Sequence, residues 1–391
     1  MKSKKITYAS AIILMGFIIL MGICADKNLF DFSVLGIKAS NYEFSDDDGN
    51  SAELDYAVNF PLKTSFVDLN GAIRKLFHQH EMNGVTKLNN GYLTVLQGRL
   101  PIKSLDKYSD ALKYYSDWCE KRGTKLLFVQ PPYTDSKYDP ELPCGDVDYS
   151  NDNMDYLLNS LRKKNIAVID LRECMHEDGI NQYDYSYRTD HHWNAKGGFY
   201  AYTKIVDWIT KYTGCEVDKR LTDIDNYQIK KYPQWHLGSR GLYTGRYYAG
   251  IDDYYLILPN FKTCIINSKD GTKGSFADQI VNWSVFSDRD AIKRYTYETA
   301  LSKNDINCMT SENAKSDISV YMISDSFATA IDPYMLLTYR DYNKGALRYP
   351  DEAFAGSKQS KINPDVVVIM PYYENYCKIN MSEIITSLND K

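Results

Sequence analysis

Lys125-Leu126-Leu127-Phe128-Val129, which Pro131 and Pro132 bring to an end, is a short and almost wholly apolar stretch. Such a run, bounded by turn residues, is typical of a strand that is buried on both faces of a sheet. The stretches Ile166–Asp170 and Asp365–Met370 have the same character. Segments with helical periodicity lie between the strands: Leu105–Arg122, Asn153–Lys164 and Trp193–Thr213. This alternation predicts a parallel sheet that helices cover on both faces.

Length and composition narrow the class of protein. The chain has 391 residues, which is enough for one large α/β domain or for two domains. Its net charge is −5 and no basic block occurs beyond the N-terminus, which argues against nucleic acid as a partner. The cysteines form no CxxC pair and show no metal-ligand spacing. The 34 Tyr residues agree with a carbohydrate-facing surface, although a general bias in composition is the preferred explanation.

The N-terminus has the pattern of a membrane anchor. Lys2, Lys4 and Lys5 precede the uncharged stretch Ile6–Ala25, and the acidic Asp26 follows it. About twenty such residues in a helix span the hydrocarbon core of a bilayer, roughly 30 Å. The lysines place the N-terminus in the cytoplasm, so we expect the rest of the chain outside the cell membrane. A cleaved signal peptide is the alternative, because the last four residues of the stretch form a passable cleavage region.

Composition also predicts the organisation of the chain. Residues 1–25 form the expected anchor, and residues 26–58 form a polar linker with an acidic cluster at Asp46–Asp48. Residues 59–391 form the main domain. Within it, residues 216–316 are rich in tyrosine and turn residues, which indicates an antiparallel insertion.

Two distant segments carry the candidate chemistry. Asp190 and His192 lie two residues apart in an expected extended segment, so their side chains point the same way. Ser326 follows the strand-like run Val320–Ile323, at the carboxyl end where open α/β sheets place ligands. A serine becomes a nucleophile when a histidine accepts its proton and a carboxylate orients that histidine. The sequence therefore predicts a Ser-His-Asp acyl-transfer site, with the Ser326 N–H as a candidate donor to an oxyanion.

Each residue also has a simpler interpretation. Ser326 could only cap the helix that follows it, and Asp190 could cap the helix that begins near Asn194. His191 and His192, with acids nearby, could form a metal site and a metal-dependent hydrolase. We expect no metal and no cofactor. We expect Trp193 to be a buried anchor of the helix start.

Several of these segments together resemble a known family. Arg188–Trp193, with Gly197 downstream, resembles the signature of the DHHW proteins, which are related to the alginate O-acetylation proteins and the SGNH hydrolase-like acyltransferases. Ser324–Phe327 resembles the Gly-Asp-Ser block of these proteins, with Ser324 in place of the usual glycine. Further matching segments are Phe60–Lys63, Asn83–Val85, Gly91–Leu93 and Val129–Pro132. The resemblance runs from about residue 56 to the C-terminus, and the insertion matches poorly.

The resemblance implies a fold and an activity. The fold is a three-layer α/β/α SGNH hydrolase-like domain, flavodoxin-like, with a parallel sheet and a position outside the membrane. The activity is transfer of acetyl groups on cell-envelope or exopolysaccharide sugars, without a cofactor. Carried over by position, Ser326 is the nucleophile, His192 the base and Asp190 the acid that orients it, while His191 is structural or faces the substrate.

Other polar residues are weaker candidates for substrate binding. Ser239 and Arg240, in a glycine-flanked loop, could cover the site, although a solvated turn explains them as well. Arg348 resembles an arginine downstream of the serine in related proteins and could hold an acidic sugar, or it forms an ordinary ion pair. Tyr372 follows the last strand at the same sheet edge as Ser326, where it could stack on a sugar ring or simply cover the sheet.

Two functions from different classes follow. The first is an extracytoplasmic O-acyltransferase or acetylesterase that acts on a polysaccharide through an acyl-serine intermediate, which transfer and hydrolysis share. A chain with one anchor has no visible route to cytoplasmic acyl donors, so transfer implies a multi-spanning membrane partner. The alternative is a catalytically silent glycan-binding or scaffold protein of an envelope polysaccharide assembly complex.

Overall fold

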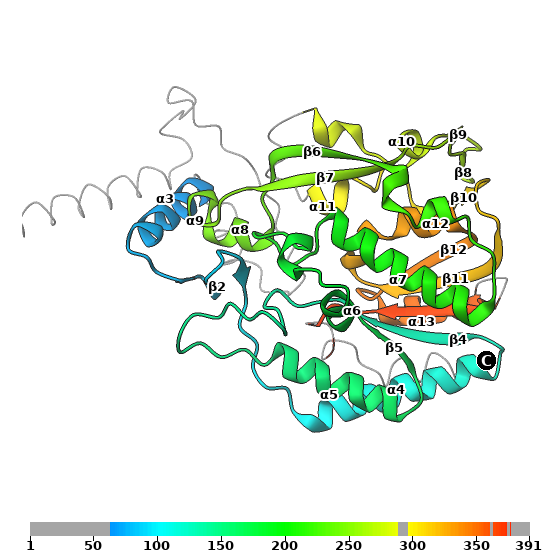
Figure 1. Cartoon of the computed structure of the whole chain (residues 1–391), viewed down its shortest axis with the longest axis horizontal. Coiled ribbons are helices and arrows are strands. Elements are labelled where there is room, and N and C mark those ends of the chain that lie inside the picture. Colours follow the sequence, from blue (N-terminus) through cyan, green and yellow to red (C-terminus); the bar gives the residue numbers. More distant parts are fainter. Residues whose placement is uncertain (1–62, 288–295, 360–362, 374–375, 377–391) are drawn as a thin grey trace, which may run out of the picture.

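The computed structural model describes residues 63–287, 296–359, 363–373 and 376 (Figure 1). The expected anchor and linker, residues 1–58, lie outside this part of the chain. Among the described residues, no helix has both the length and the apolar character that crossing a membrane requires.

A five-stranded sheet forms the centre of the molecule, and every neighbouring pair of its strands is parallel. This confirms the predicted mixed α/β fold with a parallel sheet. In spatial order the strands are β12 (Tyr339–Ala346), β11 (Ser316–Ser324), β13 (Val366–Met370), β4 (Lys125–Gln130) and β5 (Ala167–Asp170).

The order of the strands departs from the flavodoxin-like prediction. If the five strands are numbered in chain order and the sheet is followed from β5 to β12, the spatial order is 2-1-5-3-4, whereas flavodoxin has the order 2-1-3-4-5. The C-terminal strand β13 lies in the middle of the sheet, between β11 and β4. Its residues are apolar and fully buried on both faces, so a central place removes more apolar surface from water than an edge would.

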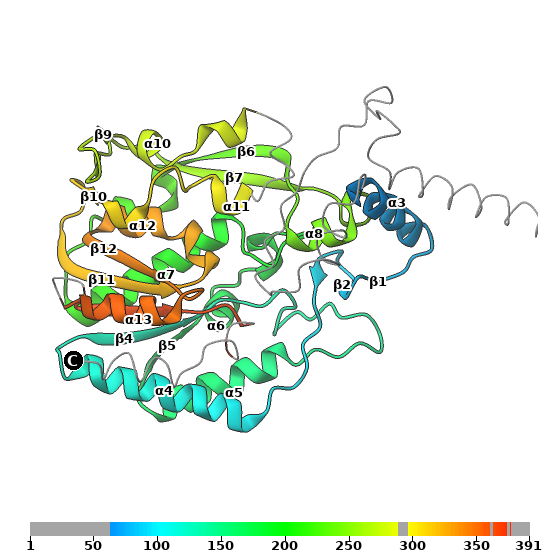
Figure 2. The ribbon, with the colours of Figure 1, turned by 180° about the vertical axis from the view of Figure 1, so that it is seen from behind.

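Helices cover both faces of this sheet (Figures 1 and 2). On one face, Tyr115 of α4 contacts Phe354 of α13 edge to face at 4.9 Å. On the other face, the Tyr202 hydroxyl of α7 lies 2.7 Å from the Thr338 hydroxyl of α12. The helices of the first face are α4 (Ile102–Glu120), α5 (Ser150–Lys163) and α13 (Pro350–Gln359); those of the second are α7 (Ala195–Thr213) and α12 (Asp332–Thr338).

Antiparallel strands occur within residues 216–316. The longest pair is β6 (Tyr227–His236) with β7 (Asp252–Pro259), and a smaller sheet joins β10 (Met309–Ser311), β8 (Ile265–Asn267) and β9 (Lys273–Gly274). The β6–β7 ribbon runs above α7 and ends next to the carboxyl edge of the central sheet (Figure 1).

The remaining elements are short, apart from α3. They are α3 (Lys63–Leu76), β1 (Glu81–Met82), β2 (Val85–Lys87), β3 (Leu93–Thr94), α6 (Leu171–Glu177), α8 (Ser239–Thr244), α9 (Arg246–Ala249), α10 (Phe276–Gln279) and α11 (Thr296–Thr299). β1 and β2 form a hairpin whose turn residues, Asn83 and Gly84, both have positive φ, as a two-residue Asn-Gly turn requires.

Candidate active site

Ser326 begins a short 3-10 helix, Ser326–Ala330, immediately after β11. Asp325 caps this helix, because its Oδ1 accepts the N–H of Phe327 at 3.1 Å. The other carboxylate oxygen, Oδ2, accepts the N–H of Tyr372 after β13. The interpretation of Ser326 as the cap is therefore wrong, and its hydroxyl is left for other chemistry.

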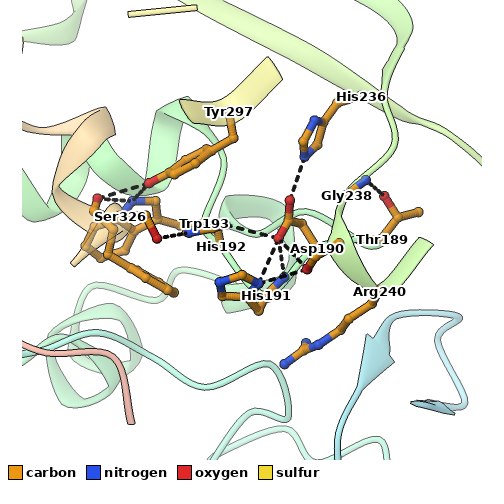
Figure 3. Close-up of polar contacts among 12 residues, drawn as sticks. Thr189, Asp190, His191, His192, Trp193, His236, Gly238, Arg240, Tyr297 and Ser326 are labelled. Atoms are coloured by element: carbon orange, nitrogen blue, oxygen red, sulfur yellow. Dashed lines mark hydrogen bonds and ion pairs between the residues drawn. The ribbon is translucent and has the colours of Figure 1, made fainter. Parts of the chain in front are cut away.

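His192 joins Ser326 to Asp190 (Figure 3). Its Nε2 lies 2.7 Å from the Ser326 Oγ, and its Nδ1 lies 3.0 Å from the Asp190 Oδ1. A carboxylate can only accept, so Nδ1 carries the proton and Nε2 is free to accept the serine proton. The structure thus brings the three predicted catalytic residues together in the order that a Ser-His-Asp site requires.

The segment that carries Asp190 and His192 is fixed by its flanks. Asn194, not Asp190, caps α7: its Oδ1 accepts the N–H groups of Lys196 and Gly197. Trp193 is 1% exposed, and its Nε1–H donates to the Phe327 carbonyl at 3.1 Å. This contact ties the start of α7 to the helix of Ser326, as expected of a buried anchor.

Aromatic rings hold the His192 imidazole from several sides. Tyr297 of α11 stacks on it at 4.1 Å with an interplanar angle of 21°, and the His191 ring lies 3.8 Å away. Phe327 approaches at 4.9 Å. The Tyr297 hydroxyl accepts from the Trp193 indole and donates to the Phe327 carbonyl, both at 3.0 Å. Sequence reasoning missed Tyr297, because no motif distinguishes it from the other tyrosines of the segment 216–316.

Asp190 is bonded on both carboxylate oxygens (Figure 3). Oδ1 also accepts the N–H of His191 at 2.7 Å and lies 3.3 Å from the Ser239 hydroxyl. Oδ2 accepts from Nε2 of His236, the last residue of β6, at 2.9 Å. Sequence reasoning also missed His236, which stands 46 positions from Asp190 without a recognisable spacing.

The charges of the site suit a general base. Burial by itself would raise the pKa of Asp190, but His192 and the hydrogen bonds of three histidines hold this pKa well below its usual range. Burial, followed by the effect of neighbouring His191, lowers the pKa of His192. At neutral pH the pair is therefore a carboxylate and a neutral imidazole, which is the state that accepts a proton from serine.

Sequence comparison identifies a known type of domain in part of the chain. Residues 103–223, which contain Asp190 and His192, match the SGNH hydrolase-like domain of the acetyltransferase AlgX. The predicted resemblance to SGNH hydrolase-like proteins is confirmed. This match covers less than half of the chain, and no curated protein matches the chain in sequence.

Two solved structures align with this fold over most of the chain. The structure of Bacillus cereus PatB1 with a sulfonyl adduct aligns with a TM-score of 0.57 and 18% identity, over 76% of this chain and 97% of that one. A DHHW family protein from Eubacterium siraeum aligns with a TM-score of 0.54 and 17% identity, over 80% of this chain and 98% of that one. At these identities the likeness concerns the fold.

A cavity opens beside Ser326, and one of the four weaker candidates for substrate binding, Arg348, lines it. Its volume is about 630 Å³, and Arg348, Glu298, Lys344 and Thr329 are among the residues that line it. Arg348 is exposed, whereas Lys344 forms an ion pair with Asp332 at 2.7 Å. Ser324, which replaces the usual glycine, ends β11, and it too lines the cavity.

His191 and Ser239 lie next to the carboxylate of Asp190. The His191 side chain is 28% exposed, and its Nδ1 lies 3.0 Å from the Ser239 hydroxyl. These two side chains form one hydrogen-bonded group with Asp190 at the beginning of α8.

Arg240 and Tyr372 are buried and contact protein groups. Arg240 donates to the Leu93 carbonyl at 2.7 Å, to the Thr134 hydroxyl and to the Tyr372 hydroxyl at 3.1 Å. The Tyr372 ring stacks on Phe327 at 4.8 Å. These contacts do not favour the prediction that either side chain binds a substrate. Arg240 holds the Tyr372 hydroxyl, and the Tyr372 ring packs on Phe327 next to the site.

Proposed function

We propose that the protein is a serine-dependent O-acyltransferase or acetylesterase that acts on cell-envelope or exopolysaccharide glycans. One observation carries the proposal: the hydrogen-bonded chain from Asp190 through His192 to Ser326, with distances of 3.0 and 2.7 Å. The likeness to an SGNH hydrolase-like acetyltransferase domain supports acyl transfer as the type of reaction.

The first half of the reaction forms an acyl-serine. The Ser326 Oγ attacks the carbonyl carbon of the acyl donor while its proton passes to His192 Nε2. The Asp190 carboxylate stabilises the imidazolium that results. The negative oxygen of the tetrahedral intermediate faces the start of the 3-10 helix, where the Ser326 N–H is the candidate donor. When the ester C–O bond breaks, His192 returns its proton to the leaving oxygen.

The second half transfers the acyl group to an acceptor. His192 takes a proton from the acceptor hydroxyl, whose oxygen attacks the carbonyl carbon of the acyl-serine. When the bond to Ser326 Oγ breaks, His192 returns this proton to Oγ and the free serine is restored. With a sugar hydroxyl the product is a new ester, and with water it is a free acid. In this proposal the cavity beside Ser326 holds the acceptor, and Arg348 receives an acidic group of the glycan.

The proposal includes a location and a partner. The uncharged N-terminal stretch between lysines and Asp26 favours a single-pass anchor with the catalytic domain outside the membrane. If the protein transfers acyl groups, a multi-spanning membrane protein supplies them from the cytoplasmic side.

The test uses the full chain in detergent with p-nitrophenyl acetate and a small sulfonyl fluoride. The PatB1 structure carries a sulfonyl adduct, and a sulfonyl fluoride reacts with an activated serine by losing fluoride. We expect nitrophenol release, together with one label on Ser326 by mass spectrometry. Ser326→Ala and His192→Ala should abolish both, whereas Ser104→Ala, which changes an exposed serine that does not line the cavity, should keep both.

Two outcomes would overturn the proposal. A folded protein that releases no nitrophenol and takes up no label would favour the silent glycan-binding alternative. Loss of activity with a chelator, without labelling of Ser326, would favour a metal-dependent hydrolase, since ligand atoms of Asp190, His191 and His192 lie within 4.8 Å of one another.

A further inference from the structure

His236 is a second histidine on the carboxylate of Asp190, and it comes from outside the serine and histidine segments. It ends β6, and its Nε2 lies 2.9 Å from Asp190 Oδ2, whereas His192 binds Oδ1. The side chains of His236 and Asp190 are 0% and 2% exposed. The contact is therefore sheltered from water, where a hydrogen bond to a charged group is strongest.

We propose that His236 is a positioning residue of the acyl-transfer site: it fixes the Asp190 carboxylate so that Oδ1 stays directed at His192. This inference rests on the proposed function of Ser326. It assigns a role in catalysis to the β6–β7 ribbon, which contains neither the serine nor the DHHW segment.

The geometry explains why a second donor is needed. The last torsion of an aspartate side chain is broad, so a carboxylate that is held at one oxygen can rotate away from its partner. His236 holds the second oxygen and fixes the plane of the group. Its Nε2 carries the proton because it faces a carboxylate, while Nδ1 is buried and has no hydrogen-bond partner in the described structure.

The ribbon holds His236 and the Asp190 segment as one unit. His236 is paired with Asp252 of β7, and the Oδ2 of Asp252 accepts the N–H and the hydroxyl of Thr189 at 2.8 and 2.7 Å. The N–H of Gly238 donates to the same hydroxyl at 2.9 Å. Thr189 immediately precedes Asp190, so the ribbon binds both the main chain next to Asp190 and the Asp190 carboxylate.

Titratable groups and aromatic rings surround His236. Asp190 faces Nε2, and Asp252 and Tyr254 approach from β7. The Tyr187 ring lies 4.4 Å from the imidazole, and His192 stands on the far side of Asp190. A change at His236 therefore reaches His192 through Asp190.

The test compares His236→Leu, which removes the donor, with His236→Gln, whose side-chain amide can donate to the same oxygen. We expect His236→Leu to lower kcat/KM for p-nitrophenyl acetate about 10- to 100-fold, the range for loss of a partner that orients an active group. His236→Gln should recover most of this loss. Tyr187→Phe is the control for a small change next to the ring, because its hydroxyl has no hydrogen-bond partner within the described residues.

The pH profile separates positioning from simple structural support. Without the His236 N–H, the Asp190 carboxylate turns away from His192. His192 then loses the charge and the hydrogen bond that raise its pKa, so the acid limb of kcat/KM moves to lower pH in His236→Leu. Equal losses in both variants, or an unmoved acid limb with a lower Tm, would overturn the positioning role. If the unmodified protein shows no reaction that depends on Ser326, the proposed function itself fails, and the role of His236 fails with it.

Discussion

Gly238→Ala should disable the site by displacing Asp190. Gly238 has a φ of −74°, which any residue adopts, so only space requires a glycine here. A Cβ on Gly238 would lie 2.3 Å from the Asp190 Cβ and 2.6 Å from both its Cα and its Cγ. Ordinary van der Waals contact begins near 3.4 Å, so the two segments must separate by roughly 1 Å.

This displacement is large for a site held by hydrogen bonds. A shift of roughly 1 Å takes the Asp190 Oδ1 out of good contact with His192 Nδ1, which now stands at 3.0 Å. Misplacement on this scale costs on the order of 100-fold in rate, so we expect kcat/KM to fall about 100-fold, or about 2.7 kcal/mol of transition-state stabilisation. The crowding should also lower the free energy of unfolding by about 1–3 kcal/mol.

The assay measures kcat/KM for p-nitrophenyl acetate, together with denaturant unfolding of each variant. Gly98→Ala is the matched control, because a Cβ at that glycine would meet nothing within 4 Å. A folded Gly238→Ala protein with the kcat/KM of the parent would refute the reasoning. It would mean either that Asp190 does not need its observed position or that the loop yields without moving the carboxylate.

Three further outcomes follow from the same geometry. Because burial lowers the pKa of His192, the acid limb of kcat/KM should lie below pH 6.5, the ordinary histidine value. Initial rates measured above and below pH 6.5 check this. Below pH 6.5 the unfolded His192 binds a proton that the folded one does not, so stability should fall with acidification by up to about 1.4 kcal/mol per pH unit from this residue, and His192→Gln should flatten that slope in unfolding titrations. Tyr297→Phe loses the hydroxyl contacts to Trp193 and Phe327 but keeps the ring, so it should lower the free energy of unfolding by about 1–2 kcal/mol and keep most of the rate. Tyr297→Leu also loses the ring that stacks on His192, so it should lower the rate as well. Equal rates in the two variants would show that this stacking is unimportant.

The parts of the fold that depend on local pattern were predictable. The apolar run Val366–Met370 predicted a strand buried on both faces, and β13 is such a strand. Its place between β11 and β4 was not predictable, because strand order depends on which distant faces pack together and not on the run itself. The serine, histidine and aspartate could be found because each sits in a short segment whose geometry the sequence largely sets.

The residues that support the site were not predictable in the same way. His236 and Tyr297 each come from the tyrosine-rich segment, and each reaches the site by a contact with a residue more than forty positions away. A lone histidine at a strand end and one tyrosine among many carry no local signal. Their roles appear only when the ribbon and α11 are packed against the start of α7.

The catalytic residues and the residues that orient them come from different parts of the fold. The central sheet and the start of α7 position the nucleophile and the base. Residues of the segment 216–316 make the remaining contacts to the acid and to the base. His236 holds the second oxygen of Asp190, and Tyr297 covers a face of the His192 ring. A protein that retained Ser326, His192 and Asp190 but lost these two contacts would present the same motif in a looser geometry, and proton transfer depends on distance and orientation more than on residue identity. The motif is therefore necessary for the proposed chemistry, and the ribbon beside it decides how well the motif is oriented.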